Sequence, residues 1–224
     1  MNDNRQIVAI DGPAGAGKST VARRVAKALD FAFLDTGAMY RAATWRAMRK
    51  GIDLDDAEAV AASTGEMDLE ISTPDGVTRV TVDGEDVSEA IRTPEVTRLI
   101  YKIDQNPRVR EQLVRLQQEF GARRPTVAEG RDMGTVVFPN TPCKVYLDAS
   151  LEERTRRRAA EMRAKGVEVD EAQLALEIQE RDEQSQRRAT SPLRQAEDAI
   201  RIDTTAMTLE EVVAAIVDYA RRVL

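Results

Sequence analysis

A phosphate-binding loop is the clearest chemical signal in this sequence. Residues 12–20 read GPAGAGKST and fit the pattern G-x-x-x-x-G-K-[ST], between a short apolar run and a helical pattern. Glycines let backbone N–H groups point at an anion, and the following helix adds the positive end of its dipole. The residues expected to contact the bound nucleotide are Gly12, Pro13, Ala14, Gly15, Ala16, Gly17, Lys18, Ser19 and Thr20.

Two side chains of this loop have distinct expected roles. Lys18 would reach the β- and γ-phosphates, which makes it a candidate catalytic residue. The hydroxyl of Ser19 is the expected protein ligand of Mg²⁺. The loop therefore predicts a nucleoside triphosphate with Mg²⁺ as cofactor, and by itself it leaves the phosphate acceptor open.

Arginines follow two of the predicted strands. Arg41 comes after the apolar run 31–34, and Arg131 comes after the run 126–128. Arg110 lies in a helical pattern at 107–120, while Arg181 and Arg188 would share one face of a helix at about 170–188. Because guanidinium groups bind phosphate oxygens in a fork geometry, Arg41 and Arg131 are candidates for holding an acceptor phosphate.

A second arginine group lies in another helical pattern. It consists of Arg154, Arg157 and Arg158, and taken alone such a group is typical of a solvated helix face. This pattern therefore carries no functional argument without further information.

The chain contains no histidine, which excludes Ser-His-Asp chemistry and histidine metal sites. An alcohol acceptor would benefit from a base, although an aspartate could supply one. A phosphate monoester is mostly dianionic at neutral pH and needs charge neutralisation instead. An arginine-rich site without histidine therefore suits a nucleoside monophosphate. A GTPase is disfavoured because no asparagine is followed by lysine.

Five short apolar runs, each followed by an acidic residue, predict buried parallel strands. They span 7–10, 31–34, 126–128, 144–147 and 199–202, and the acids are Asp11, Asp35, Glu129, Asp148 and Asp203. The helical patterns between them favour an α/β fold with a doubly wound parallel sheet, whose ligands bind beyond the carboxyl ends of the strands. Each acid is equally consistent with a role as a helix cap.

Local signals set the expected helix boundaries. The patterns predict helices at 18–29, at 38–50 before Gly51, and at 107–120 with Gly121 as the stop. Residues 150–153 and 208–211 fit the capping-box pattern. Residues 67–93 alternate polar and apolar around Pro74-Asp75-Gly76 and Asp83-Gly84, which predicts a small antiparallel β insert.

Composition bounds the remaining possibilities. The chain has 224 residues, 42% of them hydrophobic, and a net charge of −6, which suits one domain and disfavours a nucleic-acid partner. Its single cysteine, Cys143, excludes an intrachain disulfide. The polar N-terminus, MNDNRQ, does not fit a signal peptide, and no apolar run is long enough to span a membrane. We therefore expect a cytoplasmic monomer.

Specific stretches along nearly the whole chain resemble the bacterial cytidylate kinases, within the phosphate-loop family of nucleoside monophosphate kinases. They are IDGPAGAGKST (10–20), LDTGAMYR (34–41), DGEDVSEAIRT (83–93), PRVR (107–110), EGRDMGTVVFP (129–139), LDASLEERTRRR (147–158), RD (181–182), RRATSPL (187–193) and IDTT (202–205). The first stretch is common to many kinases. LDTGAMYR, EGRDMGTVVFP and the insert are much more specific.

The resemblance implies a reaction and an organisation. ATP and CMP or dCMP would give ADP and CDP or dCDP. The fold would be a five-stranded phosphate-loop kinase, with its core at 1–62, 94–153 and 168–224. The monophosphate-binding β insert would span about 63–93, and a lid would span about 154–167. A kinase for UMP or another small acceptor, and a nucleotide-binding regulator that no longer transfers phosphate, remain the alternatives.

The resemblance also implies roles around the acceptor. Arg41 and Arg131 would hold its phosphate, with Arg188 nearby, and Arg181 would lie near the ribose or the transferring phosphate. The residues around the cytosine would be Thr36, Arg110 and Asp132. A carboxylate can accept from the cytosine amino group, which uracil lacks, so Asp132 would discriminate between the two bases.

The remaining implied roles concern the lid. Arg154 and Arg157 would contact ATP, while Arg158 joins Lys18 and Arg131 as a candidate catalytic residue. Closure of such a lid would exclude water and limit futile hydrolysis of ATP.

Two positions depart from the family pattern. Tyr101 stands where the family commonly has a base-reading serine, and Ser185 stands where it commonly has an aspartate that binds the sugar hydroxyls. Both stay in the predicted CMP site, because a tyrosine can stack on a base and a hydroxyl can bind a ribose more weakly than a carboxylate does. The departures leave open the preference among CMP, dCMP and UMP.

Overall fold

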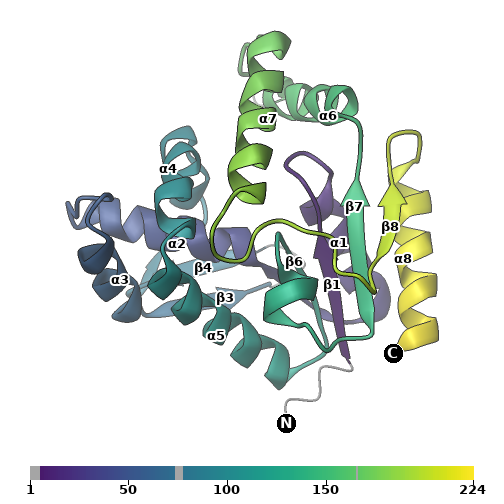
Figure 1. Cartoon of the computed structure of the whole chain (residues 1–224), viewed down its shortest axis with the longest axis horizontal. Helices are drawn as coiled ribbons and strands as arrows, with labels where there is room; N and C mark the ends of the chain where they lie inside the picture. Colours follow the sequence, from purple (N-terminus) through teal and green to yellow (C-terminus); the bar gives the residue numbers. More distant parts are fainter. Residues whose placement is uncertain (1–5, 74–77, 165) are drawn as a thin grey trace.

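A five-stranded parallel sheet forms the centre of the molecule (Figure 1). The computed structural model describes residues 6–73, 78–164 and 166–224. The strand order is β2-β6-β1-β7-β8. The strands are β1 (Ile7–Asp11), β2 (Ala32–Asp35), β6 (Thr126–Gly130), β7 (Cys143–Asp148) and β8 (Ile200–Asp203). The predicted α/β class and all five strands are confirmed, and each strand extends to include its acidic residue.

Helices cover both faces of the sheet, which explains why its central strands β1 and β6 are buried without alternation. Val8 and Ile10 of β1 pack with α1 (Lys18–Leu29) and α8 (Leu209–Val223), while Ile7 and Ala9 pack with α2 (Thr36–Arg49) and α5 (Pro107–Arg123). Every residue of β1 and β6 is buried. The phosphate loop is therefore anchored to the most buried strand.

Two helices, α2 and α5, have bounds that differ from those predicted, whereas α1 has the predicted bounds. Helix α2 begins two residues earlier because Asp35 caps it, accepting from the N–H of Ala38 at 2.8 Å. Helix α5 continues past Gly121 to Arg123. A Cβ at Gly121 would lie 2.8 Å from Phe138 Cε1, so this glycine serves close packing, and its prediction as the helix stop was wrong.

Only one of the two predicted capping boxes is complete. At α8, the Thr208 and Glu211 side chains each bind the other's backbone N–H. At α6 (Leu151–Ala164), Ser150 accepts from the N–H of Glu153, but its own N–H donates to Thr205. The carboxylate of Glu153 binds neighbouring arginines instead, so this box is half formed.

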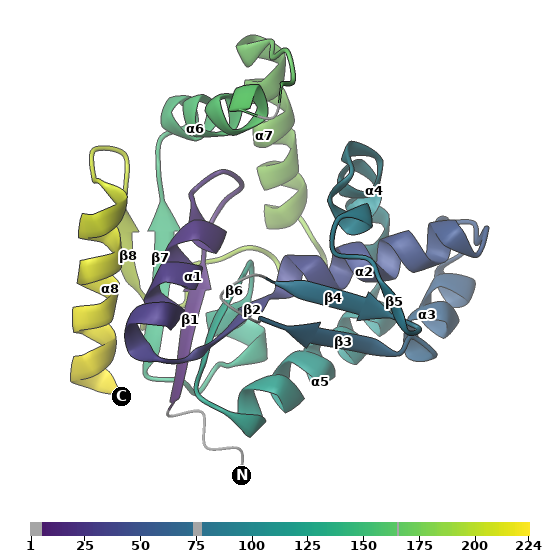
Figure 2. The same cartoon turned by 180° about the vertical axis from the view of Figure 1, so that it is seen from behind.

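The predicted insert is a three-stranded antiparallel sheet beside α2 (Figure 2). It follows α3 (Ala57–Gly65) and consists of β3 (Leu69–Ser72), β4 (Arg79–Val82) and β5 (Glu85–Asp86). Asp83 and Gly84 form its second turn with φ of 50° and 83°. The predicted turn at Pro74-Asp75-Gly76 lies outside the described residues, as do residues 1–5 of the N-terminal stretch. The chain returns to the core through η3 (Ala90–Arg92) and α4 (Pro94–Asp104).

Helix α6 pairs with α7 (Glu171–Gln186) at the carboxyl end of the sheet, above the phosphate loop (Figures 1 and 2). Ala159, Leu174 and Ile178 form a small apolar cluster with Ala14 of that loop. This pair and α4 therefore stand on either side of the carboxyl edge of the sheet. No helix within the described ranges is both long and apolar enough to cross a membrane.

Candidate active site

The phosphate loop joins β1 to α1 in the strand–loop–helix setting that its motif requires. Gly12 has φ of 151°, and a Cβ there would lie 2.0 Å from Leu147 O, so only glycine fits. Lys18 extends across the loop, and its Nζ donates to Pro13 O at 2.7 Å. Burial, and then the charge of Arg131, lower the pKa of Lys18, so this ammonium would gain from an anionic ligand.

A hydroxyl and two carboxylates gather beside the loop. Ser19 Oγ donates to Glu129 Oε1 at 2.5 Å. Burial, and then the charge of Asp35, raise the pKa of Glu129, so two negative groups lie close together in a buried site. Oxygen ligands of this kind suit Mg²⁺, and a cation would relieve the repulsion between the carboxylates.

Three neighbouring strands deliver the principal charged groups. Strand β2 leads to Arg41 in α2, β6 leads to Arg131, and β1 leads to the phosphate loop. Arg131 donates to Gly12 O, and burial lowers its pKa. Burial lowers the pKa of Arg181 to about 10, with further lowering by Arg131 and Arg41. These guanidiniums lie close enough to repel one another, and a bound anion would relieve that repulsion.

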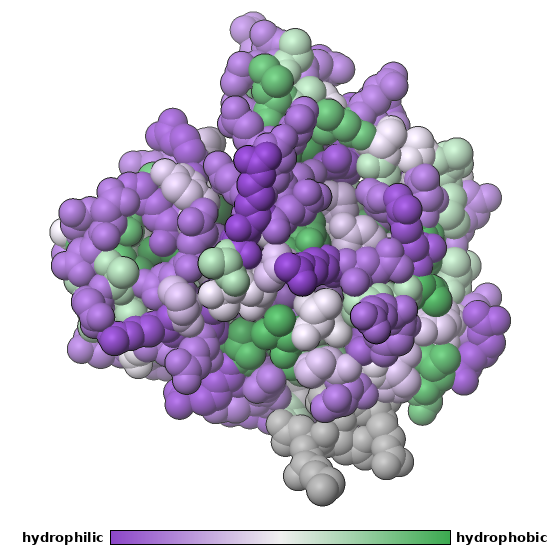
Figure 3. Space-filling model, viewed as in Figure 1, coloured by the Kyte–Doolittle hydropathy of each residue, from purple (hydrophilic) through white to green (hydrophobic). Residues whose placement is uncertain are grey.

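Four buried polar atoms in this region have no partner among the described residues. They are Tyr40 Oη, Arg41 Nε, Arg110 Nε and Arg188 Nη2. Buried polar groups in folded proteins are nearly always hydrogen-bonded, so such a cluster indicates a place where a polar ligand completes the network. Strongly hydrophilic side chains also gather on this face of the molecule, between the α4 side and the α6–α7 pair (Figure 3).

A buried ion pair lies on the α5 side of the site. Arg110 binds Asp132 through Nη2 and Oδ2, and the two side chains are only 2% and 4% exposed. The Arg110 guanidinium also lies 5.4 Å from the centre of the Tyr40 ring. Asp132 precedes a π-helical turn, η4 (Met133–Val137), which follows β6. Thr36 is buried nearby, and its hydroxyl donates to Glu129 O at 2.7 Å.

The three arginines of α6 have different surroundings. Arg154 is buried, pairs with Asp182, and donates to Ala14 O at 2.9 Å. Arg157 donates to Thr204 O at 2.6 Å, and its Nη1 lies 3.9 Å from the position of a Cβ on Gly17. Arg154 and Arg157 therefore flank the phosphate loop and are not a solvated face.

Arg158 is the third of these arginines, and it is more exposed. It pairs with Glu161 at 2.7 Å, with 42% of its side chain exposed. Its charge also lowers the pKa of Arg181, after the larger effects of burial, Arg131 and Arg41.

The predicted helical position of one CMP contact, Arg188, differs in the structure. Helix α7 ends at Gln186, so Arg188 does not share a helical face with Arg181, and that prediction was wrong. The reason is that Ser185 O accepts from Leu193 N at 2.9 Å and from Arg188 Nε at 3.4 Å as the chain turns away. Ser185 Oγ donates to Arg181 O at 2.9 Å. Tyr101 is 37% exposed, one turn of α4 before Asp104.

The acids after the strands divide into two groups. Asp35 and Glu129 lie at the site, and Asp11 lies beneath it, where its carboxylate accepts from two backbone N–H groups of η4 at 2.8 Å each. Asp148 pairs with Arg201 on the surface, and Asp203 accepts from Thr205. Asp148 and Asp203 follow the strands on the opposite side of β1 from Asp35 and Glu129.

Sequence reasoning missed two acids that lie at the site. Asp104, at the end of α4, binds Arg188, and Asp182, on α7, binds Arg154 and the N–H of Ala14. Both lie on helices rather than after strands, so the strand-end rule could not find them. Only the dipeptide of Arg181 and Asp182 gave a hint, through the family resemblance.

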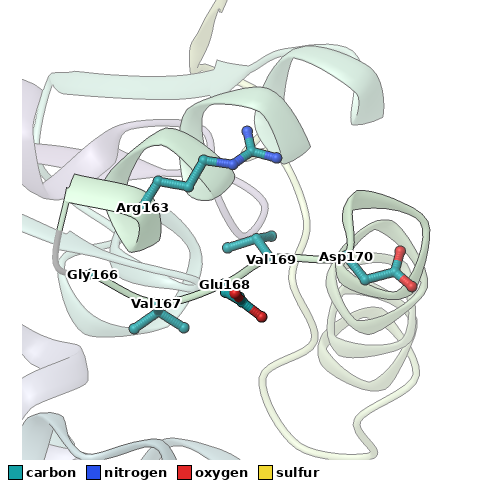
Figure 4. Close-up of a pocket in the computed structure, with 6 residues that line it drawn as sticks. All are labelled: Arg163, Gly166, Val167, Glu168, Val169 and Asp170. Carbon is teal, nitrogen blue, oxygen red and sulfur yellow. The ribbon is translucent and has the colours of Figure 1, made fainter.

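A surface hollow at the turn between α6 and α7 is a separate feature (Figure 4). Its lining residues are Arg163, Gly166, Val167, Glu168, Val169 and Asp170. Arg163 pairs with Glu171, and the Asp170 carboxylate caps α7. Because Arg163 and Asp170 have structural partners and the hollow lies at the far end of the helix pair, it is not part of the candidate site.

Comparisons with known proteins agree with this geometry. The cytidylate kinase family model matches residues 8–222. A cytidylate kinase from Syntrophotalea carbinolica is 46% identical over 210 residues, 93% of this chain and 89% of that protein. One from Carboxydothermus hydrogenoformans is 46% identical over 215 residues, 96% of this chain and 97% of that protein.

A solved structure shares the fold alone. The crystal structure of a gluconokinase from Sinorhizobium meliloti is 16% identical and matches with a TM-score of 0.50, covering 97% of this chain and 93% of that one.

Proposed function

Because this chain belongs to the cytidylate kinase family, we propose that it transfers the γ-phosphate of ATP to CMP or dCMP, giving ADP and CDP or dCDP. The observation that carries this proposal is the group of buried guanidiniums beside the phosphate loop. Three nitrogens of these guanidiniums, and the hydroxyl of Tyr40 beside them, lack partners among the described residues. Such a site suits an acceptor that is itself an anion.

Arg41 and Arg131 are proposed to hold the acceptor phosphate. Arg131 lies beyond β6, which neighbours β1, and Arg41 lies beyond β2, which neighbours β6. Arg131 already touches the phosphate loop at Gly12 O. Holding two phosphates side by side requires neutralisation of their mutual repulsion, which guanidiniums provide. The acceptor oxygen is already deprotonated at neutral pH, so the absence of histidine has no cost.

The phosphate loop and Lys18 are proposed to hold the donor. The ammonium of Lys18 would exchange Pro13 O for the β- and γ-phosphates of ATP. Ser19 would hold Mg²⁺, with Asp35 and Glu129 near it, and the ion would neutralise charge on the phosphate oxygens. Catalysis then rests on alignment and electrostatic stabilisation rather than on a base.

Asp132 and Arg110 are proposed to read the base, with Thr36 beside them. Asp132 Oδ2 is held by Arg110, so the carboxylate is fixed to accept from the cytosine amino group through its other oxygen. Uracil presents a carbonyl there and would leave a buried acceptor without a donor, which is costly.

Two parts of the chain are proposed to close over the nucleotides. The insert at about 63–93 would cover CMP, and the lid at about 154–167 would bring Arg158 towards the transferring phosphate. Arg154 and Arg157 would hold the ATP side. The core would comprise 1–62, 94–153 and 168–224. We expect a monomer in the cytoplasm, where ATP and CMP are found.

The test is release of ADP from ATP and Mg²⁺ with CMP, dCMP, UMP, AMP, GMP and a non-nucleotide alcohol as acceptors. We expect turnover with CMP and dCMP, and kcat/KM for UMP about a hundredfold lower or more. No turnover with any monophosphate would overturn the proposal.

A pair of variants tests the base-reading role. Asp132→Asn should reduce the ratio of kcat/KM for CMP to that for UMP by about tenfold or more. The reason is that asparagine has one acceptor oxygen, whereas aspartate has two. Asp203→Asn is the matched control, since that carboxylate only caps the turn at Thr205. Equal preferences in the two variants would contradict the role of Asp132.

A further inference from the structure

Asp104 is a carboxylate that lies among several guanidiniums of the site. Its Oδ2 accepts from Arg188 Nη1 at 3.3 Å, and its side chain is 21% exposed. Its backbone carbonyl accepts from Arg110 Nη1 at 3.3 Å. No residue that the structure describes donates a hydrogen bond to the other carboxylate oxygen, Oδ1. Asp104 can therefore accept one further hydrogen bond.

The other short polar side chains of this region are already engaged. Ser185 Oγ donates to Arg181 O, and Thr36 Oγ1 donates to Glu129 O. Asp132 resembles Asp104, because each gives one oxygen to an arginine and keeps the other for a ligand. Asp132 and Asp104 are therefore two carboxylates that each pair with an arginine of the proposed acceptor side.

A nucleoside monophosphate also has two kinds of donor, the amino group of its base and the hydroxyls of its sugar. Asp132, paired with Arg110 beside Tyr40, is proposed above to serve the base. The sugar joins the base to the phosphate. A protein group that accepts a hydrogen bond from the sugar must therefore lie between the Asp132–Arg110 pair and the arginines proposed to hold the phosphate.

Asp104 has this intermediate position. Burial raises the pKa of Asp104, and the guanidiniums of Arg188 and Arg110 oppose that shift, followed by those of Arg131 and Arg181. The carboxylate is therefore close to the arginines on both sides. Because α4 ends at Asp104, the helix fixes its side chain at this junction.

We infer that Asp104 is a specificity-determining residue whose free oxygen accepts from a hydroxyl of the acceptor's sugar. The inference rests on the proposed function and extends it to the third part of the nucleotide. Through Arg188, the same contact also orients a guanidinium that has one buried nitrogen without a partner among the described residues. The ligand feature recognised is the sugar hydroxyl, not the phosphate or the base.

The experiment compares Asp104→Asn with the wild-type chain, using CMP, dCMP and 2′,3′-dideoxy-CMP as acceptors. The amide keeps the shape of the carboxylate but loses its charge and one of its two acceptor atoms. We expect kcat/KM for CMP to fall about ten- to a hundredfold, mainly through KM, as loss of a hydrogen bond to a charged group implies. The value for 2′,3′-dideoxy-CMP should change less than about twofold, because that acceptor has no sugar hydroxyl to lose.

The result for dCMP distinguishes the two hydroxyls. A fall equal to that for CMP indicates the 3′-hydroxyl, and an unchanged value indicates the 2′-hydroxyl, and both results support the inference. Equal losses for CMP and 2′,3′-dideoxy-CMP would overturn it, since Asp104 would then act only on the shape of the site. An unchanged value for CMP would overturn it as well.

Asp55→Asn is the matched control, because Asp55 contacts the same helix from outside it. Asp55 pairs with Lys102 of α4 at 2.6 Å, with 72% of its side chain exposed, so this variant disturbs α4 without touching the site. Its three kcat/KM values should match the wild type, and thermal unfolding of both variants tests whether they fold. Failure of the proposed function is recognised separately, because the wild-type chain would then not turn over CMP.

Discussion

Replacing Asp182 by asparagine should weaken both the fold and ATP binding, because this carboxylate joins the phosphate loop to the α6–α7 pair. Its Oδ1 accepts from the N–H of Ala14 at 2.7 Å, and its Oδ2 accepts from Arg154. Arg154 in turn donates to Ala14 O at 2.9 Å and to Ala149 O at 3.0 Å. One carboxylate and one guanidinium thus hold both backbone groups of Ala14.

The expected magnitude follows from burial. The side chains of Arg154 and Asp182 are 11% and 9% exposed. Removing one partner of a buried ion pair costs about 3–5 kcal/mol. Asparagine can keep the bond from Ala14, and Arg154 keeps two carbonyl acceptors, so we expect a loss of about 2–3 kcal/mol, below that range. A loosened loop should also raise KM for ATP about tenfold, with a smaller change in KM for CMP.

Urea unfolding and steady-state kinetics measure these two effects. Glu183→Gln is the matched control, because Glu183 pairs with Arg187 on the exposed side of α7 and should change the free energy of unfolding by less than about 0.5 kcal/mol. If Asp182→Asn resembles this control in both stability and KM for ATP, the loop does not depend on the Asp182–Arg154 pair and the reasoning is refuted.

Three further predictions concern buried positions away from the ligands. Burial raises the pKa of Asp11 from 3.8 to about 7, so between these pH values the folded chain holds a proton that the unfolded chain releases. The free energy of unfolding of the wild type, relative to that of Asp11→Asn, should therefore fall as pH rises from 3.8 to 7. Urea unfolding at several pH values measures this difference, and a rise would contradict the prediction. Burial raises the pKa of Cys143 to about 12, so a thiol reagent at pH 8 should label this cysteine only in the unfolded chain. Rapid labelling of the native protein would show that the thiol is accessible in the fold. Gly121→Ala gains about 1 kcal/mol of helix propensity. It also places a Cβ 2.8 Å from Phe138 and 3.0 Å from Ile7, and this overpacking costs about 1–3 kcal/mol. We therefore expect a lower Tm, and a higher Tm would mean that the two side chains move aside.

The sequence by itself determined the sheet, the loop and the chemistry of the donor site. Apolar runs such as 7–10 are readable because a strand buried on both faces has no polar alternation. The phosphate loop is readable because its glycines, lysine and serine act through the backbone and side chains of one continuous segment. The turn at Asp83 and Gly84 is readable for the same reason, since its positive φ values are a local requirement.

Tertiary structure decided what depends on neighbours distant in the chain. Gly121 was predicted as a helix stop, yet it lies inside α5 because Phe138 packs against it. The arginines of α6 had the pattern of a solvated face, and only the approach of the phosphate loop and α7 showed that Arg154 is buried.

The acceptor site shows the same division. Asp104 and Asp182 carry no local signal, because an acid on a helix surface and an acid aimed into a site are identical in sequence. What distinguishes them is the presence of guanidiniums from other elements, Arg188 for Asp104 and Arg154 for Asp182, brought within hydrogen-bond distance by packing. Local patterns determined which elements form, and the contacts between those elements determined which charges meet.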